Sequence, residues 1–520
     1  MHTLKKFAEN IGWLFLGTII SNIISLSITI FLIRKLPINE FGIYSLFFGS
    51  LSVFAMFSIN GILVSLTRFS PELIQKNYFT FHKSIVIRLF LMSLFMTCVF
   101  VIIIFIYKDA IGNLLRIPNF SLYYSIFIIN IFIYLEFTVS QNILIPLFEQ
   151  KFLSIINVIG IIVRGCLYWL LFSKISIDLI FIIEAAGLGV STVPSLIYAY
   201  NKLSKLTDNS DIITPANEKK EYKRRIYRFA LLSTASEMGE GGFSQISDYY
   251  FVSAFLGPFA MGLYAFPYKI ISSIFNWIPI GRINELMRPY FINKYYEKKE
   301  DNSYLNETFN FLVKVFILLY GIIIISILSY QKIINIYVFK SKYIETQLLL
   351  TVILMFVLIR AFTFSIYMII ELKEKVEHSL YAQSFAIFNV FAVIFVLRYT
   401  GWGLIGVAFA TGLSNLLRNI YMYLVMKRNT KVKLSFSNFI STFSIIFLVG
   451  AGMYLSSLTN IILIQIILPV IVGAVSFPIF YKIIRPFSVN EEMILSNIIY
   501  RFSPKLRILS KVFGLSQSNI

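Results

Sequence analysis

The feature that most constrains this chain is a series of long apolar runs that recur along its whole length. The hydrocarbon core of a bilayer is about 30 Å thick, so about 20 apolar residues can cross it as a helix. The composition agrees, because 58% of the residues are hydrophobic and 14% are charged, outside the usual range of water-soluble domains. The runs do not alternate as barrel strands do. We therefore expect an all-α integral membrane protein with about fourteen transmembrane helices.

The net charge of +20 is explained by topology. Basic residues crowd alternate loops, as in "KKEYKRRIYR" at residues 219–228, and such loops face the cytoplasm. This pattern predicts that both termini are cytoplasmic and that nucleic acid is not a partner. No short charged leader with a cleavage site precedes the first run, so we expect that run to be a retained span.

Internal repetition is the most informative pattern. The segment "LPINEFGIYSL" returns as "LGPFAMGLYAF" at one constant offset. The matched pairs are Leu36 with Leu256, Gly42 with Gly262, Tyr44 with Tyr264, Gly61 with Gly281, Leu66 with Leu286 and Arg68 with Arg288. An even number of expected spans separates the copies, which predicts two parallel repeats, as in two-lobed transporters. In each copy, Pro37 or the Gly257–Pro258 pair is expected to end one helix before the next begins.

These observations predict a division into two lobes and an extension. The expected parts are an amino-terminal six-helix lobe at residues 1–200, a cytoplasmic linker at 201–228, a carboxy-terminal six-helix lobe at 229–426, two additional helices at 427–484 and a cytoplasmic tail at 485–520. The linker is the longest segment between expected spans and is too polar to form a core.

A polar stripe interrupts the seventh expected span, in "SEMGEGGFSQISDYYF" and just before it. Ser233, Glu237, Glu240, Ser244 and Asp248 are spaced by three or four residues, so on one helix they would share a face. Carboxylates that face lipid cost several kcal/mol each, so we expect this face to line a water-filled cavity or other polar groups.

Three cations fall near the middle of expected spans: Arg164, Lys269 and Arg360. Each costs roughly 2.5 to 3.5 kcal/mol at mid-helix, so each must be paired or hydrated. Two readings stay open, a ligand site for an anion and ion pairs that only hold the bundle together. For the second, Lys269 has Asp248 within reach and Arg164 has Glu136.

Two arginines, Arg68 and Arg288, lie where their helices leave the membrane. The simplest expectation is that they snorkel to the headgroups. In the first copy, Glu72 follows Pro71 and could pair with Arg68 across the bend, which would make a cytoplasmic gate the alternative.

Signals of soluble enzymes are absent from the sequence. It contains no GxxxxGK[ST] or HExxH motif and only three histidines, which indicates neither a nucleotide cassette nor a zinc site. Cys98 and Cys166 fall in apolar runs, where small buried residues are the expected role. A membrane glycosyltransferase would need a large loop with catalytic acids, and the loops here are short. We expect no cofactor, no metal and no enzymatic activity.

At these residues the chain resembles a known family. The segments "FLIRKLPINEFGIYSL", "LVSLTRFSPE", "ISDYYFVSAFLGPFAMGLYAFPYKI" and "GWGLIGVAFATGLSN" are similar to the polysaccharide repeat-unit flippases, such as O-antigen flippases, of the multidrug/oligosaccharidyl-lipid/polysaccharide exporter superfamily. The resemblance covers the first eight expected helices and the opening of the twelfth. It implies a V-shaped bundle of twelve core helices plus two in the bacterial plasma membrane.

The resemblance also implies the cargo, an undecaprenyl-pyrophosphate-linked oligosaccharide that is flipped to the outer leaflet by alternating access. Arg164, Lys269 and Arg360 would then bind the pyrophosphate, and Glu237, Glu240 and Asp248 would line the sugar path or take up a coupling H⁺ or Na⁺. The polymerase and chain-length proteins of the pathway are candidate partners, and nothing requires more than a monomer. A cation-coupled multidrug exporter and a lipid II flippase are the alternatives.

Overall fold

The computed structural model describes residues 2–207, 212–241, 245–277, 302–372, 377–430, 432–459, 461–489 and 491–493. The described chain is helical throughout and contains no strand in these ranges. This agrees with the expected all-α membrane fold, since a helix satisfies its own backbone hydrogen bonds in lipid. The chain divides into two compact units, Met1–Phe266 with Ala386–Val407, and Pro267–Phe385 with Ala408–Ile520.

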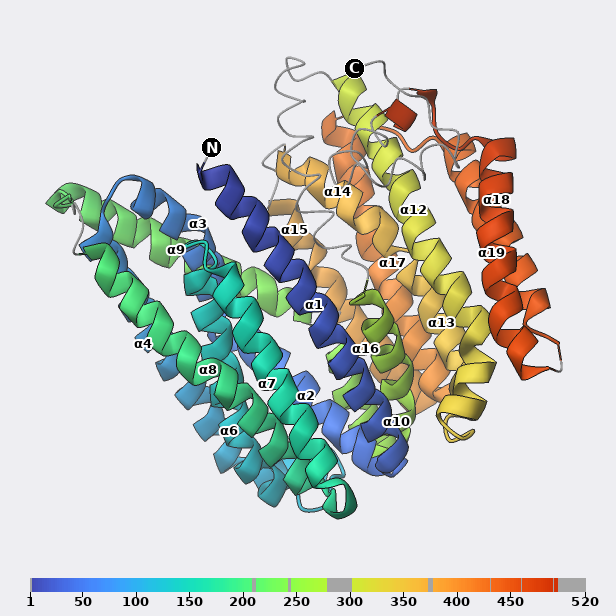
Figure 1. The fold of residues 1–520 in the computed structure, drawn as a ribbon, viewed down its shortest axis with the longest axis horizontal. Coiled ribbons are helices and arrows are strands. Elements are labelled where there is room, and N and C mark those ends of the chain that lie inside the picture. The colour runs from blue at the N-terminus through green and yellow to red at the C-terminus, as the bar shows by residue number, and fades with distance from the viewer. Residues whose placement is uncertain are drawn as a thin grey trace. The chain divides into compact units, whose positions relative to one another are not determined.

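The first unit holds most of the amino-terminal helices (Figure 1). They are α1 (His2–Lys35), α2 (Ile38–Ser58), α3 (Asn60–Gln75), α4 (Phe79–Ile106), α5 (Lys108–Leu114), α6 (Phe120–Leu144), α7 (Gln150–Leu170), η1 (Phe172–Lys174), α8 (Ile177–Thr207), α9 (Ala216–Gly241), most of α10 (Gln245–Phe275) and most of α16 (Ser384–Tyr399). Helix α1 packs along α7, α7 packs on α8, and α8 packs on α6. Helix α9 lies against α2 and α3.

The second unit is built around the long helix α12. Its elements are α12 (Asn302–Ile333), η2 (Ile334–Val338), η3 (Ile344–Thr346), α13 (Gln347–Val357), α14 (Arg360–Leu372), α15 (Glu377–Ala382), most of α17 (Gly403–Thr430), α18 (Phe436–Ser456) and α19 (Ile462–Ile484). Helix α12 packs against α13, α14 and α18, and α18 packs against α19.

Twelve described helices or helix pairs are long and apolar enough to cross a membrane. The expected count of fourteen is not reproduced, for identifiable reasons. Helix α10 counts once although it contains the break between the seventh and eighth expected spans. Helix α17 is not among the twelve, and its middle carries Asn415, Arg418 and Asn419.

The two predicted helix breaks of the repeat are confirmed. Helix α1 ends at Lys35 and Pro37 precedes α2, while Gly257 interrupts α10 with φ 86° and ψ 175°. Only glycine adopts that conformation at low cost, and Pro258 then has no N–H to donate. The glycines of the two copies meet, because a Cβ on Gly42 would collide with the backbone of Pro258 and Gly262.

The segment expected to be a linker is largely helical. Helix α8 continues to Thr207 and α9 already begins at Ala216. The boundaries predicted for the lobes, the linker, the additional helices and the tail stay predictions.

Candidate functional site

The predicted cation Arg164 lies in a buried ion-pair cluster of the first unit. One guanidinium nitrogen, Nη1, lies 2.7 Å from Oε2 of Glu184, and the other donates to Oγ of Ser25 at 3.3 Å. The Tyr168 hydroxyl donates to Oε1 of the same carboxylate at 2.8 Å. The suggestion that Glu136 pairs with Arg164 is wrong, because Glu184 takes that place.

Two glycines explain how α7 and α8 approach closely enough for this pair. A Cβ on Gly160 would collide with Oγ of Ser191 and with the Gly187 carbonyl, and a Cβ on Gly187 would lie 2.8 Å from Cβ of Arg164. Small residues of this kind let membrane helices pack backbone to backbone. Arg164 is therefore held inside a helix interface, with a carboxylate as its counter-charge.

The acidic stripe is divided between two helices. Glu237 and Glu240 belong to α9, and Asp248 belongs to the first turn of α10. Residues 242–244, with the predicted Ser244, lie outside the described residues. Asp248 is fully buried and accepts a hydrogen bond of 2.8 Å from the Tyr264 hydroxyl. The shared face predicted for the whole stripe stays a prediction.

The other two predicted cations belong to the second unit. Lys269 is half-buried in α10, beyond the Gly257 break. Arg360 is exposed and is the first residue of α14, directly after the interruption that separates α13 from α14 within one candidate span. Its charge acts on the Tyr320 hydroxyl of α12. Within the described ranges Arg360 forms no ion pair.

Of the residues predicted for the gate, Arg68 and Glu72 form an ion pair. Nη1 of Arg68 lies 3.4 Å from Oε2 of Glu72, and Oε1 of Glu72 accepts a 2.7 Å hydrogen bond from Tyr222 of α9. Arg225 of α9 adds a second cation at 3.7 Å. Arg288, the equivalent of Arg68 in the second copy, lies outside the described residues. Glu72 therefore ties the end of α3 to α9, and the gate itself stays a prediction.

A second set of contacts extends this attachment. The Tyr78 hydroxyl donates to Oε2 of Glu218 at 3.1 Å, and Nζ of Lys76 lies 3.7 Å from the same oxygen. A hydrogen bond to Tyr222 raises the pKa of Lys76. A lysine whose pKa is raised stays protonated to a higher pH than an ordinary lysine, whose pKa is about 10.4, so its attraction for Glu218 persists through and above neutral pH.

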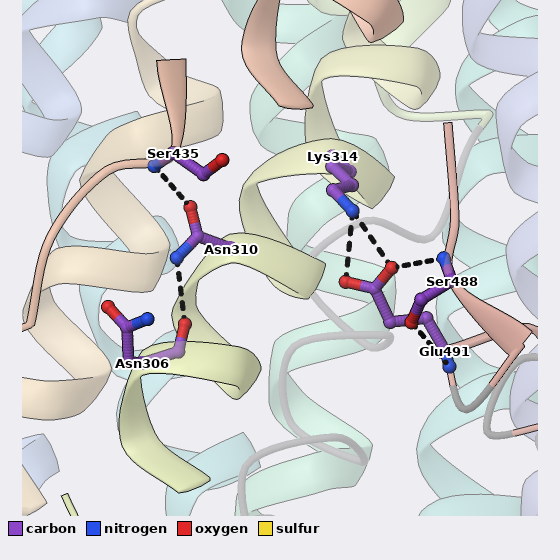
Figure 2. Close-up of polar contacts among 6 residues, drawn as sticks. All are labelled: Asn306, Asn310, Lys314, Ser435, Ser488 and Glu491. Carbon is purple, nitrogen blue, oxygen red and sulfur yellow. Dashed lines mark hydrogen bonds and ion pairs between the residues drawn. The ribbon is translucent and has the colours of Figure 1, made fainter. Parts of the chain in front are cut away.

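Sequence reasoning missed two buried cations, Lys314 in α12 and Arg418 in α17. Nζ of Lys314 lies 2.8 and 3.1 Å from the carboxylate oxygens of Glu491, which follows α19 (Figure 2). Both are single charges inside apolar runs, the same signal that identified the other three cations. That signal was sufficient to find them.

One face of α12 fixes the chain that follows two later helices. Asn306 and Asn310, spaced by four residues, bond the backbone of Lys433 and Ser435 after α17, and Lys314 continues the same face to Glu491 (Figure 2). These contacts are structural, because each polar group is satisfied within the protein. Among the described residues, no group of three or more His, Cys, Asp or Glu side chains is arranged to hold a metal.

The helical architecture is that of known membrane transport proteins. The structure of the lipid II flippase MurJ in an inward closed conformation matches with a TM-score of 0.64 at 15% identity, over 90% of this chain and 98% of that one. A multidrug resistance MATE family transporter of the MOP superfamily matches in its inward-facing conformation with a TM-score of 0.57 at 13% identity, over 80% and 94%. Its outward-facing conformation gives 0.56 at 13%, over 81% and 95%.

The twelve candidate spans thus define a multi-pass membrane protein that has the fold of known membrane transport proteins. The family model for polysaccharide biosynthesis proteins matches residues 7–278, more than half of the chain. The protein therefore belongs to the polysaccharide biosynthesis protein family. Among curated proteins, none matches the sequence.

Proposed function

We propose that this protein flips an undecaprenyl-pyrophosphate-linked oligosaccharide repeat unit across the bacterial plasma membrane, for surface polysaccharide such as O-antigen, capsule or exopolysaccharide. The polysaccharide biosynthesis family supports a glycan pathway. The fold supports transport by alternating access, since it is shared with a lipid II flippase and with a transporter known in inward- and outward-facing conformations.

The observation that carries the proposal is Arg360. It is an exposed guanidinium at an interruption inside a candidate span, and no described residue forms an ion pair with it. An arginine that faces lipid at this depth is costly, so its surroundings must be polar. A guanidinium binds phosphate in a bidentate way, which suits a pyrophosphate that has to leave water.

The three predicted cations are not equally available to an anion in this proposal. Arg164 is neutralised by Glu184 at 2.7 Å, so a pyrophosphate would have to displace that carboxylate to bind it. Arg360 is therefore the principal cation of the anion site in this proposal, Lys269 remains a second candidate, and Arg164 has a mainly structural role. The carboxylates of Glu237, Glu240 and Asp248 are proposed to line the sugar path or to bind a coupling H⁺ or Na⁺.

The test is genetic and chemical. In a deletion strain we expect the lipid-linked oligosaccharide to accumulate and the surface glycan to disappear, and the intact gene should reverse both effects. The Arg360→Ala variant, alone and with Lys269→Ala, should fail to reverse them while it reaches the membrane at normal levels. Arg398→Ala is the matched control, because Arg398 is also an exposed arginine, in the last turn of α16.

Two results would contradict the proposal. Normal surface glycan in the deletion strain would contradict the assignment of a glycan cargo. Full reversal of both effects by the double variant would contradict the assignment of the cationic site. Unaltered glycan combined with new sensitivity to organic cations would favour a multidrug exporter, for which the carboxylates would be the binding groups. Accumulated lipid II with normal surface glycan would favour the cell-wall precursor as cargo.

A further inference from the structure

One buried carboxylate of the first unit has no hydrogen-bond or ion-pair partner among the described residues. Glu136 of α6 is 7% exposed, and neither of its oxygens accepts a hydrogen bond from any described residue. The other buried carboxylates of the described chain behave differently. Glu184 binds Arg164 and Tyr168, and Asp248 binds Tyr264. Glu136 is the exception that the transport proposal leaves unexplained.

Three hydroxyl groups on α6 and on the facing helix α8 donate to backbone carbonyls. Thr138 donates to the carbonyl of Tyr134, and Ser140, one turn after Glu136, donates to the carbonyl of Phe137. Thr192 of α8, which packs on α6, donates to the carbonyls of Ile133 and Leu188. Because these three hydroxyls donate their hydrogen bonds to the backbone, they do not donate to the Glu136 carboxylate.

Charged groups on the surrounding helices do not neutralise it either. Helix α6 packs against α2, α3, α4, α5, α7 and α8. Within the described residues, no cation on these helices lies within 4.0 Å of Glu136. Their titratable or charged side chains, tyrosines aside, are Glu40, Arg68, Glu72, His82, Lys83, Arg88, Cys98, Lys108, Asp109, Lys151, Arg164, Cys166, Asp178, Glu184, Lys202 and Lys205.

Several buried or half-buried members of that set bind other groups. Arg164 and Glu184 bind each other. His82 is buried at the start of α4, and its Nε2 has no hydrogen-bond partner among the described residues. Lys202 is paired with Glu149 and Lys83 with Ser204. An ionised Glu136 would thus be a buried, uncompensated charge, which costs several kcal/mol, whereas the neutral acid avoids that cost.

The geometry points to Glu136 as a proton-binding site, a carboxyl group that is protonated in this conformation and deprotonates when transport exposes it to water. On release, the carboxyl O–H bond breaks, its electron pair stays on the carboxylate and the proton passes to water. Uptake reverses these steps on the other side of the membrane. This inference rests on the alternating access of the proposed function and gives it a proton as the coupling ion.

Infrared spectroscopy of the purified protein in lipid nanodiscs tests the site without any transport. Protonated carboxyl groups and carboxylates absorb at different frequencies, so the difference between wild type and Glu136→Gln isolates this residue. We expect the wild type to show an extra protonated-carboxyl band at neutral pH. Glu345→Gln, which alters an exposed glutamate, should leave that band unchanged.

Stability provides a second measurement. Glutamine has the shape of the protonated acid, so Glu136→Gln should fold and have a thermal midpoint at least equal to that of the wild type. Identical infrared spectra of wild type and Glu136→Gln between about pH 5 and pH 9 would overturn the site. A band that changes with Na⁺ at fixed pH would also overturn it and would indicate a sodium site.

Coupling is tested separately in inverted membrane vesicles that carry the lipid-linked oligosaccharide. Wild-type flipping should respond to an imposed pH gradient, and Glu136→Gln should lose that response. If flipping depends on the protein but the Glu136→Gln variant responds normally to the pH gradient, the coupling role of Glu136 is wrong and the proposed flippase function is retained. If no flipping depends on the protein while the infrared band is present, the proposed function falls and the proton site stands.

Discussion

At the scale of single residues, the Arg164–Glu184 pair should matter chiefly for stability. Replacing Arg164 with methionine leaves Glu184, whose side chain is 3% exposed, as a buried charge without its cation. Breaking a buried pair in this way costs about 3 to 5 kcal/mol. We expect a clearly lower midpoint for Arg164→Met in thermal unfolding of the detergent-solubilised protein.

Two further variants separate this effect from the loss of an arginine. Arg360→Met should change the midpoint little, because Arg360 is exposed and has no ion pair among the described residues. The double variant Arg164→Met/Glu184→Met should recover much of the loss, since apolar residues of similar volume often replace a buried pair without penalty. A double variant no better than Arg164→Met would contradict this account.

The candidate residues were partly accessible to sequence reasoning. A charge inside an apolar run is visible in the sequence, and Arg164, Lys269 and Arg360 were identified in that way. Its partner depends on which helix faces lie together, and α6 carried a plausible acid, Glu136, at similar depth. Arg164 pairs with Glu184 instead, because the glycines of α7 and α8 let these two helices approach closely.

At the scale of the elements, the crossing of the two repeat copies should tolerate no side chain at Gly42. A Cβ there would collide with the backbone carbonyl of Pro258, and backbone cannot move aside as a side chain can. We expect Gly42→Ala to destabilise the protein by about 1 to 3 kcal/mol, measured by thermal unfolding in detergent.

Helix α2 supplies the matched control for this prediction. A Cβ on Gly49 would lie 3.4 to 3.5 Å from side-chain atoms of Ile246 and Tyr249, which is ordinary contact. Gly49→Ala should therefore be neutral or slightly stabilising, because alanine favours helix more than glycine does. Equal effects at the two positions would argue against the backbone crossing.

The attachment of the segment after α19 to α12 leads to a further prediction. Glu491 binds the buried Lys314 and also accepts from the Ser488 backbone, while the Ser488 hydroxyl accepts from the Glu491 backbone. This reciprocal S-x-x-E arrangement orients the carboxylate. We expect Glu491→Gln to lower the thermal midpoint of the detergent-solubilised protein, because it leaves the buried Lys314 without its carboxylate.

Ser488→Ala tests the orientation alone. It removes the hydroxyl but keeps the ion pair, so its cost should be about 0.5 to 2 kcal/mol and smaller than that of Glu491→Gln. A Ser488→Ala variant that is less stable than Glu491→Gln would contradict the importance of the Lys314 contact.

Element boundaries were predictable where local chemistry decides them. Pro37 and the Gly257–Pro258 pair break helices through their own backbone properties, and both breaks occur as predicted. The helices around residues 201–228 were not predicted, because polar composition resembles a linker until a partner is known. Tyr222 and Arg225 of α9 bond Glu72 of α3, so tertiary contacts support helix in that segment.

At the scale of the whole molecule, the class of protein followed directly from the apolar runs, whereas their number did not. Hydropathy measures how long and how apolar a segment is, and it cannot distinguish a broken helix from two separate ones. Helix α10 shows this, since a single glycine conformation separates two expected spans. Helix α17 shows the converse, because polar residues in its middle remove it from the candidate spans.

The orientation in the membrane is the last prediction. Helix α8 has 31 residues and is therefore about 46 Å long, which exceeds the hydrocarbon thickness. A residue just before its start and a residue near its end therefore lie on opposite sides of the membrane. In a Cys98→Ser/Cys166→Ser background, we expect Lys174→Cys to react with a membrane-impermeant maleimide in intact spheroplasts. Lys205→Cys should react only after lysis, because the basic loops remain in the cytoplasm.

Both reporter positions are exposed on the protein, so protein packing would not explain a failure to react. The reverse labelling pattern would place the "KKEYKRRIYR" segment outside the cell, against the positive-inside rule. The α3–α9 contacts of Glu72 would then lie on the outer side, where they could not form a cytoplasmic gate. The expected pattern instead puts these contacts on the cytoplasmic side, where the proposed lipid-linked oligosaccharide would enter.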